Sequence, residues 1–168
     1  VLSIVQLSDL HNCRYGKNNA VLLQKIRDCK PDIIIMTGDM KNKYRSVPED
    51  MYLFYEQLTK LCPCIYSMGN HELKDKKMNP QSFHEYVKRL QDCGIMLSDN
   101  EVHPLPVKGI RCSFASCSSS LNRYTRWKTS ERTEDVTIPE VNTDESELNI
   151  LLSHDPELTK EYCASDYS

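Results

Sequence analysis

Four groups of side chains suited to metal binding and proton transfer each follow directly after an apolar run of the chain. They comprise two aspartates, one asparagine and three histidines, namely Asp9, His11, Asp39, Asn70, His71 and His154. In an open α/β sheet the loops beyond the carboxyl ends of the strands form the ligand crevice, so these groups are expected to converge. Their mixture of carboxylate, amide and imidazole ligands suits borderline divalent metals such as Mn²⁺, Fe²⁺ and Zn²⁺.

Each group taken alone has a simpler interpretation. An aspartate after a strand is commonly a turn or cap residue, and asparagine beside glycine is ordinary turn chemistry. His154 could be a histidine that is hydrogen-bonded at a strand end. The occurrence of all four groups, each ending an apolar run, favours a shared metal site. Asp39 is the candidate bridge, because one aspartate can offer an oxygen to each of two metals about 3.5–4 Å apart.

Alternating strands and helices are expected to position these groups. Short β-branched apolar runs predict strands at 2–7, 32–37, 64–67 and 148–153. Helical spacing of apolar residues predicts helices at 18–29, 48–62 and 80–93. Segment 95–114 is interrupted by proline and glycine and suggests hairpins on the far side of the sheet. This alternation is typical of an α/β domain.

The composition indicates one soluble globular domain over residues 1–168, with 39% apolar and 27% charged residues. The net charge of −3 gives no field that would attract nucleic acid, so no nucleic-acid partner is expected. The eight cysteines are scattered along the chain, and they are interpreted as reduced thiols. The polar segment 116–147 is expected to be a surface loop or insertion.

Taken in order, the four groups resemble the calcineurin-like metallophosphoesterases. The pattern of that family is Asp-x-His, Gly-Asp, Gly-Asn-His-Asp/Glu, a histidine, and then Gly-His-x-His. The likeness is carried by residues 3–72 and 148–156. It looks nearest to a bacterial branch whose blocks read Ser-Asp-Leu-His and Ser-His-Asp-Pro, as here, and whose members are often described as membrane-associated phosphohydrolases.

The resemblance implies a four-layer α/β/β/α sandwich of two mixed sheets and a centre of two divalent metals (Mn, Fe or Zn). It implies that Asp9 and His11 hold one metal, that Asp39 bridges, and that Asn70 and His154 hold the second. The catalytic role falls to His71, which would contact the phosphate and protonate the leaving alkoxide. The implied activity is hydrolysis of phosphomonoester, phosphodiester or pyrophosphate bonds by metal-activated water.

The chain departs from the family pattern in one block, because Gly-His-x-His does not occur in it. The favoured interpretation is a domain that is truncated or incomplete at the C-terminus and lacks its last strands. The alternative is a catalytically inactive scaffold with this fold that binds protein partners.

The substrate class is open among phosphorylated small molecules, nucleotides and lipid headgroups. Tyr44, Arg45 and Lys74 follow the metal loops and could contact a substrate, although a solvated loop face is the simpler interpretation. Membrane association through a segment upstream of Val1 is compatible with the resemblance. Localisation therefore stays open between cytoplasmic and membrane-tethered.

Overall fold

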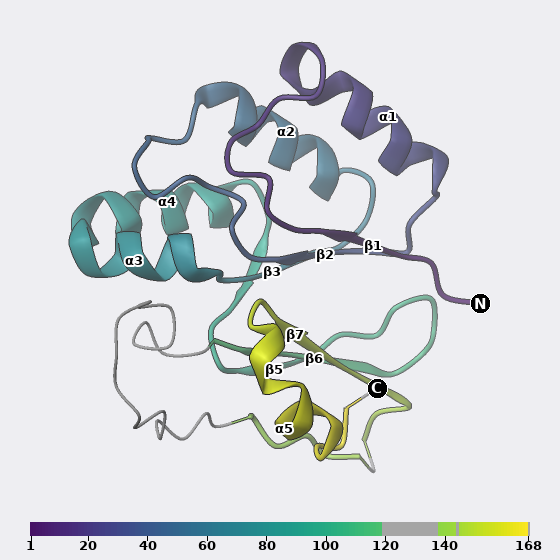
Figure 1. The fold of residues 1–168 in the computed structure, drawn as a ribbon. Helices are drawn as coiled ribbons and strands as arrows, with labels where there is room; N and C mark the ends of the chain where they lie inside the picture. Colours follow the sequence, from purple (N-terminus) through teal and green to yellow (C-terminus); the bar gives the residue numbers. More distant parts are fainter. Residues whose placement is uncertain (119–137, 144, 168) are drawn as a thin grey trace.

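The computed structural model describes residues 1–118, 138–143 and 145–167. Strands and helices alternate through its first 98 residues, in the order β1 Ile4–Leu7, α1 Ala20–Asp28, β2 Ile33–Thr37, α2 Glu49–Thr59, β3 Cys64–Ser67, α3 Asn70–Met78, α4 Pro80–Asp92 and β4 Met96–Ser98. The four strands form one sheet in the order β1-β2-β3-β4, and every pair is parallel. The helices lie together on one face of this sheet (Figure 1).

A second sheet lies against the other face. It contains β5 Val102–Pro104, β6 Cys112–Cys117 and β7 Leu148–Ser153, with β5 antiparallel and β7 parallel to the central β6. The chain then forms a short 3₁₀ turn, Pro156–Leu158, and α5, Thr159–Cys163, on the outer side of this sheet (Figure 1). The predicted arrangement of two packed sheets with helices outside is confirmed.

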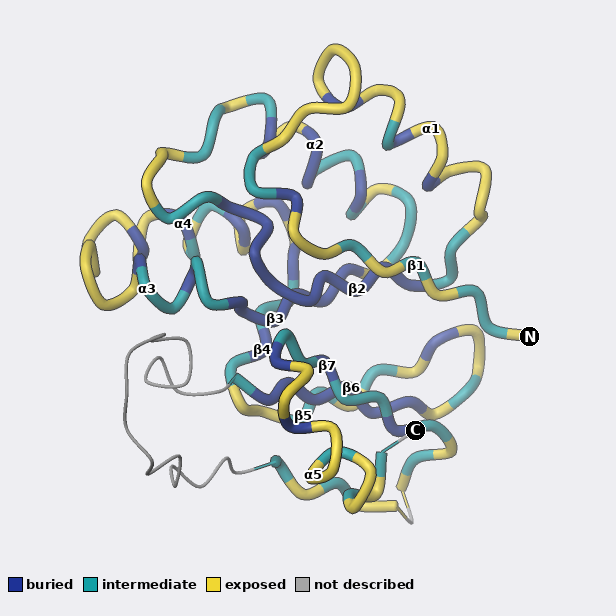
Figure 2. The backbone as a smooth tube through the Cα atoms, viewed as in Figure 1, coloured by how far each residue is buried: buried dark blue, intermediate teal, exposed yellow. Residues whose placement is uncertain are grey.

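Strand β2 shows why its sequence is an unbroken apolar run. Ile34 and Met36 face the helices, while Ile33 and Ile35 pack between the two sheets with Phe114 of β6. All five residues of the strand are buried, and Figure 2 shows β2 and β6 as buried tubes in the centre of the molecule. A strand covered on both faces has no polar side, so its sequence does not alternate.

The structure differs from the sequence-based expectations in three places. The first sheet is entirely parallel among the described residues, where a mixed sheet was expected. Segment 95–114 does not form hairpins alone, because β4 extends the first sheet before β5 and β6 pair. Helix α3 was not predicted, since its sequence is polar and lacks apolar periodicity.

The predicted loop 116–147 lies largely outside the described residues. Strand β6 continues through Cys117, so the first two residues of that segment belong to the second sheet. Among the described residues, no helix combines the length and the apolar character needed to cross a bilayer.

Candidate metal centre

The turns that follow β1 and β2 run side by side and carry three of the predicted site residues. Asp9 N–H donates to the Gly38 carbonyl at 3.1 Å, and His11 N–H donates to the Asp39 carbonyl at 2.9 Å. Asp9, His11 and Asp39 all have left-handed backbone conformations, with φ of 55°, 48° and 53°. Such conformations are uncommon for residues other than glycine and concentrate at functional sites.

Two glycines let the turns after β2 and β3 touch. A Cβ atom on Gly38 would lie 2.5 Å from the Cα of Gly69, and a Cβ atom on Gly69 would lie 2.3 Å from Oδ1 of Asp39. Real side chains do not tolerate such contacts. The glycine that precedes Asp39 and the glycine that precedes Asn70 are therefore required for the close approach of these two loops.

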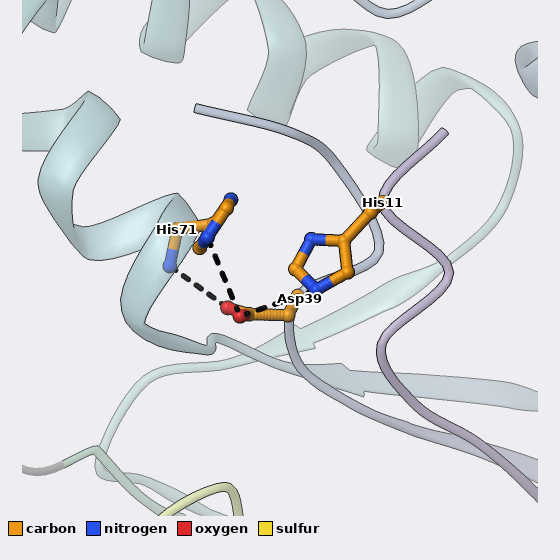
Figure 3. Close-up of side chains that lie close together, drawn as sticks. All are labelled: His11, Asp39 and His71. Atoms are coloured by element: carbon orange, nitrogen blue, oxygen red, sulfur yellow. Dashed lines mark hydrogen bonds and ion pairs between the residues drawn. The ribbon is translucent and has the colours of Figure 1, made fainter. Parts of the chain in front are cut away.

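The carboxylate of Asp39 lies at the centre of the site and is only 3% exposed. Its Oδ1 accepts the N–H of His71 at 2.8 Å, at the first turn of α3, where the helix dipole favours an anion. Its Oδ2 faces the Nε2 atoms of His154, His11 and His71 at 3.4, 3.8 and 3.9 Å. Figure 3 shows His11 and His71 both turned toward this carboxylate, and the centres of the two imidazole rings lie 4.5 Å apart.

Asp9 extends the site toward solvent. Its Oδ1 lies 3.7 Å from Nε2 of His11 and 4.0 Å from Nε2 of His154, and its side chain is 57% exposed. The potential ligand atoms fall into two groups that share Asp39, one with His11 and His71 and the other with Asp9 and His154. This shared carboxylate is the arrangement that a bridge between two metals requires.

Several features of these residues fit divalent metals. Most of the imidazole nitrogens lie 3.7–4.0 Å from carboxylate oxygens, too far for a hydrogen bond, and the hydrogen bond of His154 to Asp39, at 3.4 Å, is longer than the roughly 2.7–2.9 Å of a strong charge-assisted one. Two ligands bound to one ion at about 2.1 Å each are themselves about 3.0–3.4 Å apart, so small adjustments would accommodate a metal. Oδ1 of Asn70 and Nδ1 of His11 are buried without a hydrogen-bond partner among the described residues, which leaves the Asn70 oxygen available as a ligand.

His154 has the hydrogen-bonding pattern of a metal ligand. Its Nδ1 lies 2.8 Å from the carbonyl oxygen of Thr37, which can only accept, so Nδ1 carries a proton. Metal-binding histidines usually donate the second ring N–H to such an acceptor, which directs the other nitrogen at the metal. In the ion-free site, the hydrogen bond to Asp39 raises the pKa of His154 to about 9, so Nε2 is protonated there as well.

His71 has the opposite pattern. Its Nδ1 accepts the backbone N–H of Lys43 at 3.2 Å, so the neutral ring carries its proton on Nε2, the atom that faces Asp39. Burial lowers the pKa of His71, and the positive charges of Lys43 and Lys74 act in the same direction. The ring is thus arranged to present a proton rather than a lone pair to the centre.

Burial would raise the pKa of Asp39, but hydrogen bonds from His154 and from the His71 N–H lower it below its ordinary value. The bridging candidate is therefore ionised at neutral pH.

Sequence reasoning did not identify the residues that support the site. Glu72 is fully buried, and its carboxylate accepts the backbone N–H groups of Asp39, Lys41 and Gly69 at 2.8, 3.0 and 3.0 Å. The side chain of Lys41 forms a buried ion pair with Asp75. Glu72 could have been identified from the sequence, because it is the last residue of the Gly-Asn-His-Glu block. The sequence gives no local indication that Lys41 pairs with Asp75, because the two residues are 34 positions apart.

Comparison with known proteins agrees with the fold. Mre11, a DNA double-strand break repair protein of Methanopyrus kandleri, is 30% identical over 60 residues, which are 33% of this chain and only 13% of that protein. The crystal structure of phosphopantetheinyl hydrolase from Mycobacterium tuberculosis superposes with a TM-score of 0.53 at 15% identity, over 98% of this chain and 72% of the other, and shows the shared fold. The family model of calcineurin-like phosphoesterases matches residues 2–168. The chain therefore belongs to the calcineurin-like phosphoesterase family.

Proposed function

We propose that the chain hydrolyses phosphomonoester, phosphodiester or pyrophosphate bonds with a pair of divalent metals. The observation that carries the proposal is the position of Asp39 Oδ2, which faces three imidazole nitrogens within 3.9 Å. The residues proposed to hold the metals are those predicted from the sequence, Asp9, His11, Asp39, Asn70 and His154.

Divalent metals in such a site lower the pKa of water and offset negative charge on phosphoryl oxygens. The protein residues have separate tasks. The carboxylate of Asp39 lies in both groups of candidate ligand atoms and is proposed as the bridge, with His71, although a member of one group, not proposed as a ligand. His71 holds a proton on Nε2, within the same site, and is proposed to transfer it to the leaving oxygen as general acid. The Lys43 N–H maintains this tautomer, because it occupies the lone pair of Nδ1.

Basic residues beside His71 support an anionic substrate. Lys43 and Lys74 lie close enough for their charges to lower the pKa of His71. Tyr44 is 75% exposed, and the Lys43 ammonium lies 4.5 Å from the centre of its ring. An exposed aromatic ring and two cations beside the site suit a phosphorylated small molecule, a nucleotide or a lipid headgroup.

The proposal is tested by elemental analysis of the Mn²⁺-loaded protein, together with hydrolysis of bis-p-nitrophenyl phosphate and p-nitrophenyl phosphate. The parent is expected to hold two metals per chain and to hydrolyse at least one substrate, and Asp39→Asn should lose both properties. Asp28→Asn, at the exposed end of α1, is the matched control and should behave as the parent. A folded parent that holds no metal and hydrolyses neither substrate would favour the scaffold function.

A further inference from the structure

Helix α3 is held against the domain mainly by two buried carboxylates, together with the partly buried Leu73 that packs against the core. Its buried residues are Glu72 and Asp75, which are 0% and 3% exposed. They are three positions apart and so lie on the same side of the helix. Helices at the surface of a domain usually bury an apolar stripe instead. The contacts of these two carboxylates are therefore a main determinant of where α3 lies.

Lys41 is bound to both carboxylates. Its backbone N–H donates to Oε1 of Glu72 at 3.0 Å, and its ammonium group forms an ion pair with Asp75. The residue is only 3% exposed, and the ring of Tyr86 lies 5.0 Å from its Nζ. Asp75 also accepts a hydrogen bond from the side chain of Asn79 at 3.0 Å. Both partners of the ion pair are thus enclosed by protein.

This contact joins the two chain segments that meet at the metal centre. Lys41 lies two residues after Asp39, and Glu72 directly follows His71. Glu72 also accepts the N–H of Asp39 at 2.8 Å. The separation between Asp39 and the first turn of α3 therefore depends on how the loop at 39–41 is fixed to the helix.

Net stability does not account for an ion pair in this position. Removing two charges from water costs about as much as their attraction returns, and an apolar pair of similar size often leaves a protein equally stable. What the ion pair provides in addition is a defined direction and length between loop and helix, which apolar contacts do not specify.

We propose that Lys41 and Asp75 are positioning residues for the metal centre. Their ion pair fixes the loop that carries Asp39 against α3, and so holds the Asp39 carboxylate at the separation from Asn70 that metal binding needs. The inference rests on the proposed function, because it concerns the same site, but it assigns a role to two residues that neither bind metal nor contact substrate.

The test replaces the ion pair by an apolar pair in Lys41→Met/Asp75→Leu. Two quantities are measured for the whole chain: the urea midpoint of the metal-free protein, and the affinity for Mn²⁺ by titration calorimetry. We expect the midpoint to equal or exceed that of the parent, while Mn²⁺ affinity falls at least tenfold. A merely structural ion pair would not separate these two readouts.

Asp75→Glu provides a second variant if the apolar pair does not fold. It retains both charges but lengthens the carboxylate side chain by one methylene, so a positioning role again predicts weaker Mn²⁺ binding. The control is the exposed ion pair of Arg89, near the end of α4, with Glu49, at the start of α2, whose charged atoms lie 2.5 Å apart. Arg89→Met/Glu49→Gln should bind Mn²⁺ as the parent does.

The outcomes distinguish this inference from the proposed function. A parent that binds no Mn²⁺ would overturn both. A parent that binds Mn²⁺, with a folded Lys41→Met/Asp75→Leu or Asp75→Glu variant of equal affinity, would overturn only the positioning role of the ion pair. Weaker binding in a folded variant whose urea midpoint is not below that of the parent, with the Arg89 and Glu49 control unchanged, supports it, whereas weaker binding together with a lowered midpoint would mean that the ion pair is merely structural.

Discussion

His71 and His154 face the same oxygen of Asp39, yet their second ring nitrogens make opposite hydrogen bonds. Nε2 of His154 lies 3.4 Å and Nε2 of His71 lies 3.9 Å from Oδ2 of Asp39. Nδ1 of His154 contacts the carbonyl of Thr37, whereas Nδ1 of His71 accepts the N–H of Lys43. One imidazole is arranged to give a lone pair and the other to give a proton, so the two histidines are not interchangeable.

This difference predicts separate effects of the two substitutions. His154→Ala is expected to lose bound metal and turnover together, because a metal ligand has been removed. His71→Ala should retain metal close to the parent level but lose about 10²–10⁴-fold in turnover, the usual contribution of a general acid. Metal content by elemental analysis and steady-state hydrolysis of p-nitrophenyl esters measure the two effects.

One outcome would reverse the assignment of His71 as proton donor and His154 as metal ligand. If His71→Ala lost metal as completely as His154→Ala, His71 would be a ligand, and the Lys43 N–H would have to release its Nδ1. His84→Ala, an exposed histidine on α4, is the control and should change neither metal content nor turnover.

The ion-free protein should become less stable as the pH rises from about 6.5 to 9. The hydrogen bond to Asp39 raises the pKa of His154 to about 9, above the roughly 6.5 of an unfolded histidine. Between these two pKa values the folded state keeps a proton on His154 that the unfolded state has lost. The stabilisation that this proton provides is therefore complete below the lower pKa and disappears as the pH rises through the upper one. The expected loss is on the order of 2–3 kcal/mol.

Urea unfolding in EDTA between pH 6.5 and 9.5 measures this dependence. Burial lowers the pKa of His71, so that histidine contributes only below this window. His154→Asn retains a donor for the Thr37 carbonyl but cannot titrate, and its stability should be flat between pH 6.5 and about 8. Above that pH the thiols of Cys62 and Cys64, whose pKa burial raises to about 11 and about 12, should lower the stability of both proteins alike, so the His154 contribution is the difference between them. An equal slope in parent and His154→Asn would show that another group is responsible.

The convergence of Asp9, Asp39 and Asn70 was predictable because they follow β1, β2 and β3, neighbouring parallel strands whose carboxyl ends lie at one edge of a sheet. His154 follows β7 of the second sheet, so its place in the site depends on how the two sheets pack. The turn glycines could also be identified from the sequence, since Gly38 and Gly69 stand directly before site residues. The assignment of individual ligand roles stays a prediction.

The supporting contacts were not predictable because they cross between distant segments. Helix α3 begins immediately at Asn70, and its polar sequence has no apolar period that would mark it as a helix. Its buried residues are acidic, and burial of a carboxylate depends on donors that the sequence does not identify locally. The tautomers of His71 and His154 likewise depend on a backbone N–H and a carbonyl that only the folded chain brings near.

Gly69→Ala should disable the metal centre while leaving the fold largely intact. Its φ of −96° and ψ of −174° are accessible to alanine, so the backbone is not the obstacle. The added Cβ would meet Oδ1 of Asp39 at 2.3 Å and its N at 2.5 Å, which forces the carboxylate or α3 to move. We expect at least tenfold weaker Mn²⁺ binding by calorimetry and about 1–3 kcal/mol lower stability.

Gly109→Asn is the comparison for this substitution. Apart from its chain neighbours, no atom of the described residues lies within 4 Å of a Cβ at Gly109, and asparagine tolerates its positive φ of 80° better than other side chains do. Its Mn²⁺ affinity should equal that of the parent. Unchanged affinity in Gly69→Ala would mean that the loops after β2 and β3 can separate without cost to the site.

Glu72→Gln tests whether the buried carboxylate holds the site loops through its acceptors. Oε2 receives the N–H groups of Asp39 and Gly69, and Oε1 receives that of Lys41, so both oxygens are in use. The glutamine NH₂ group must replace one oxygen and then faces a donor, which should cost about 1–3 kcal/mol in the free energy of unfolding. Glu85→Gln, at an exposed position of α4, should leave that free energy unchanged. If urea unfolding gave Glu72→Gln the stability of the parent, these three N–H groups would have to be satisfied without the carboxylate.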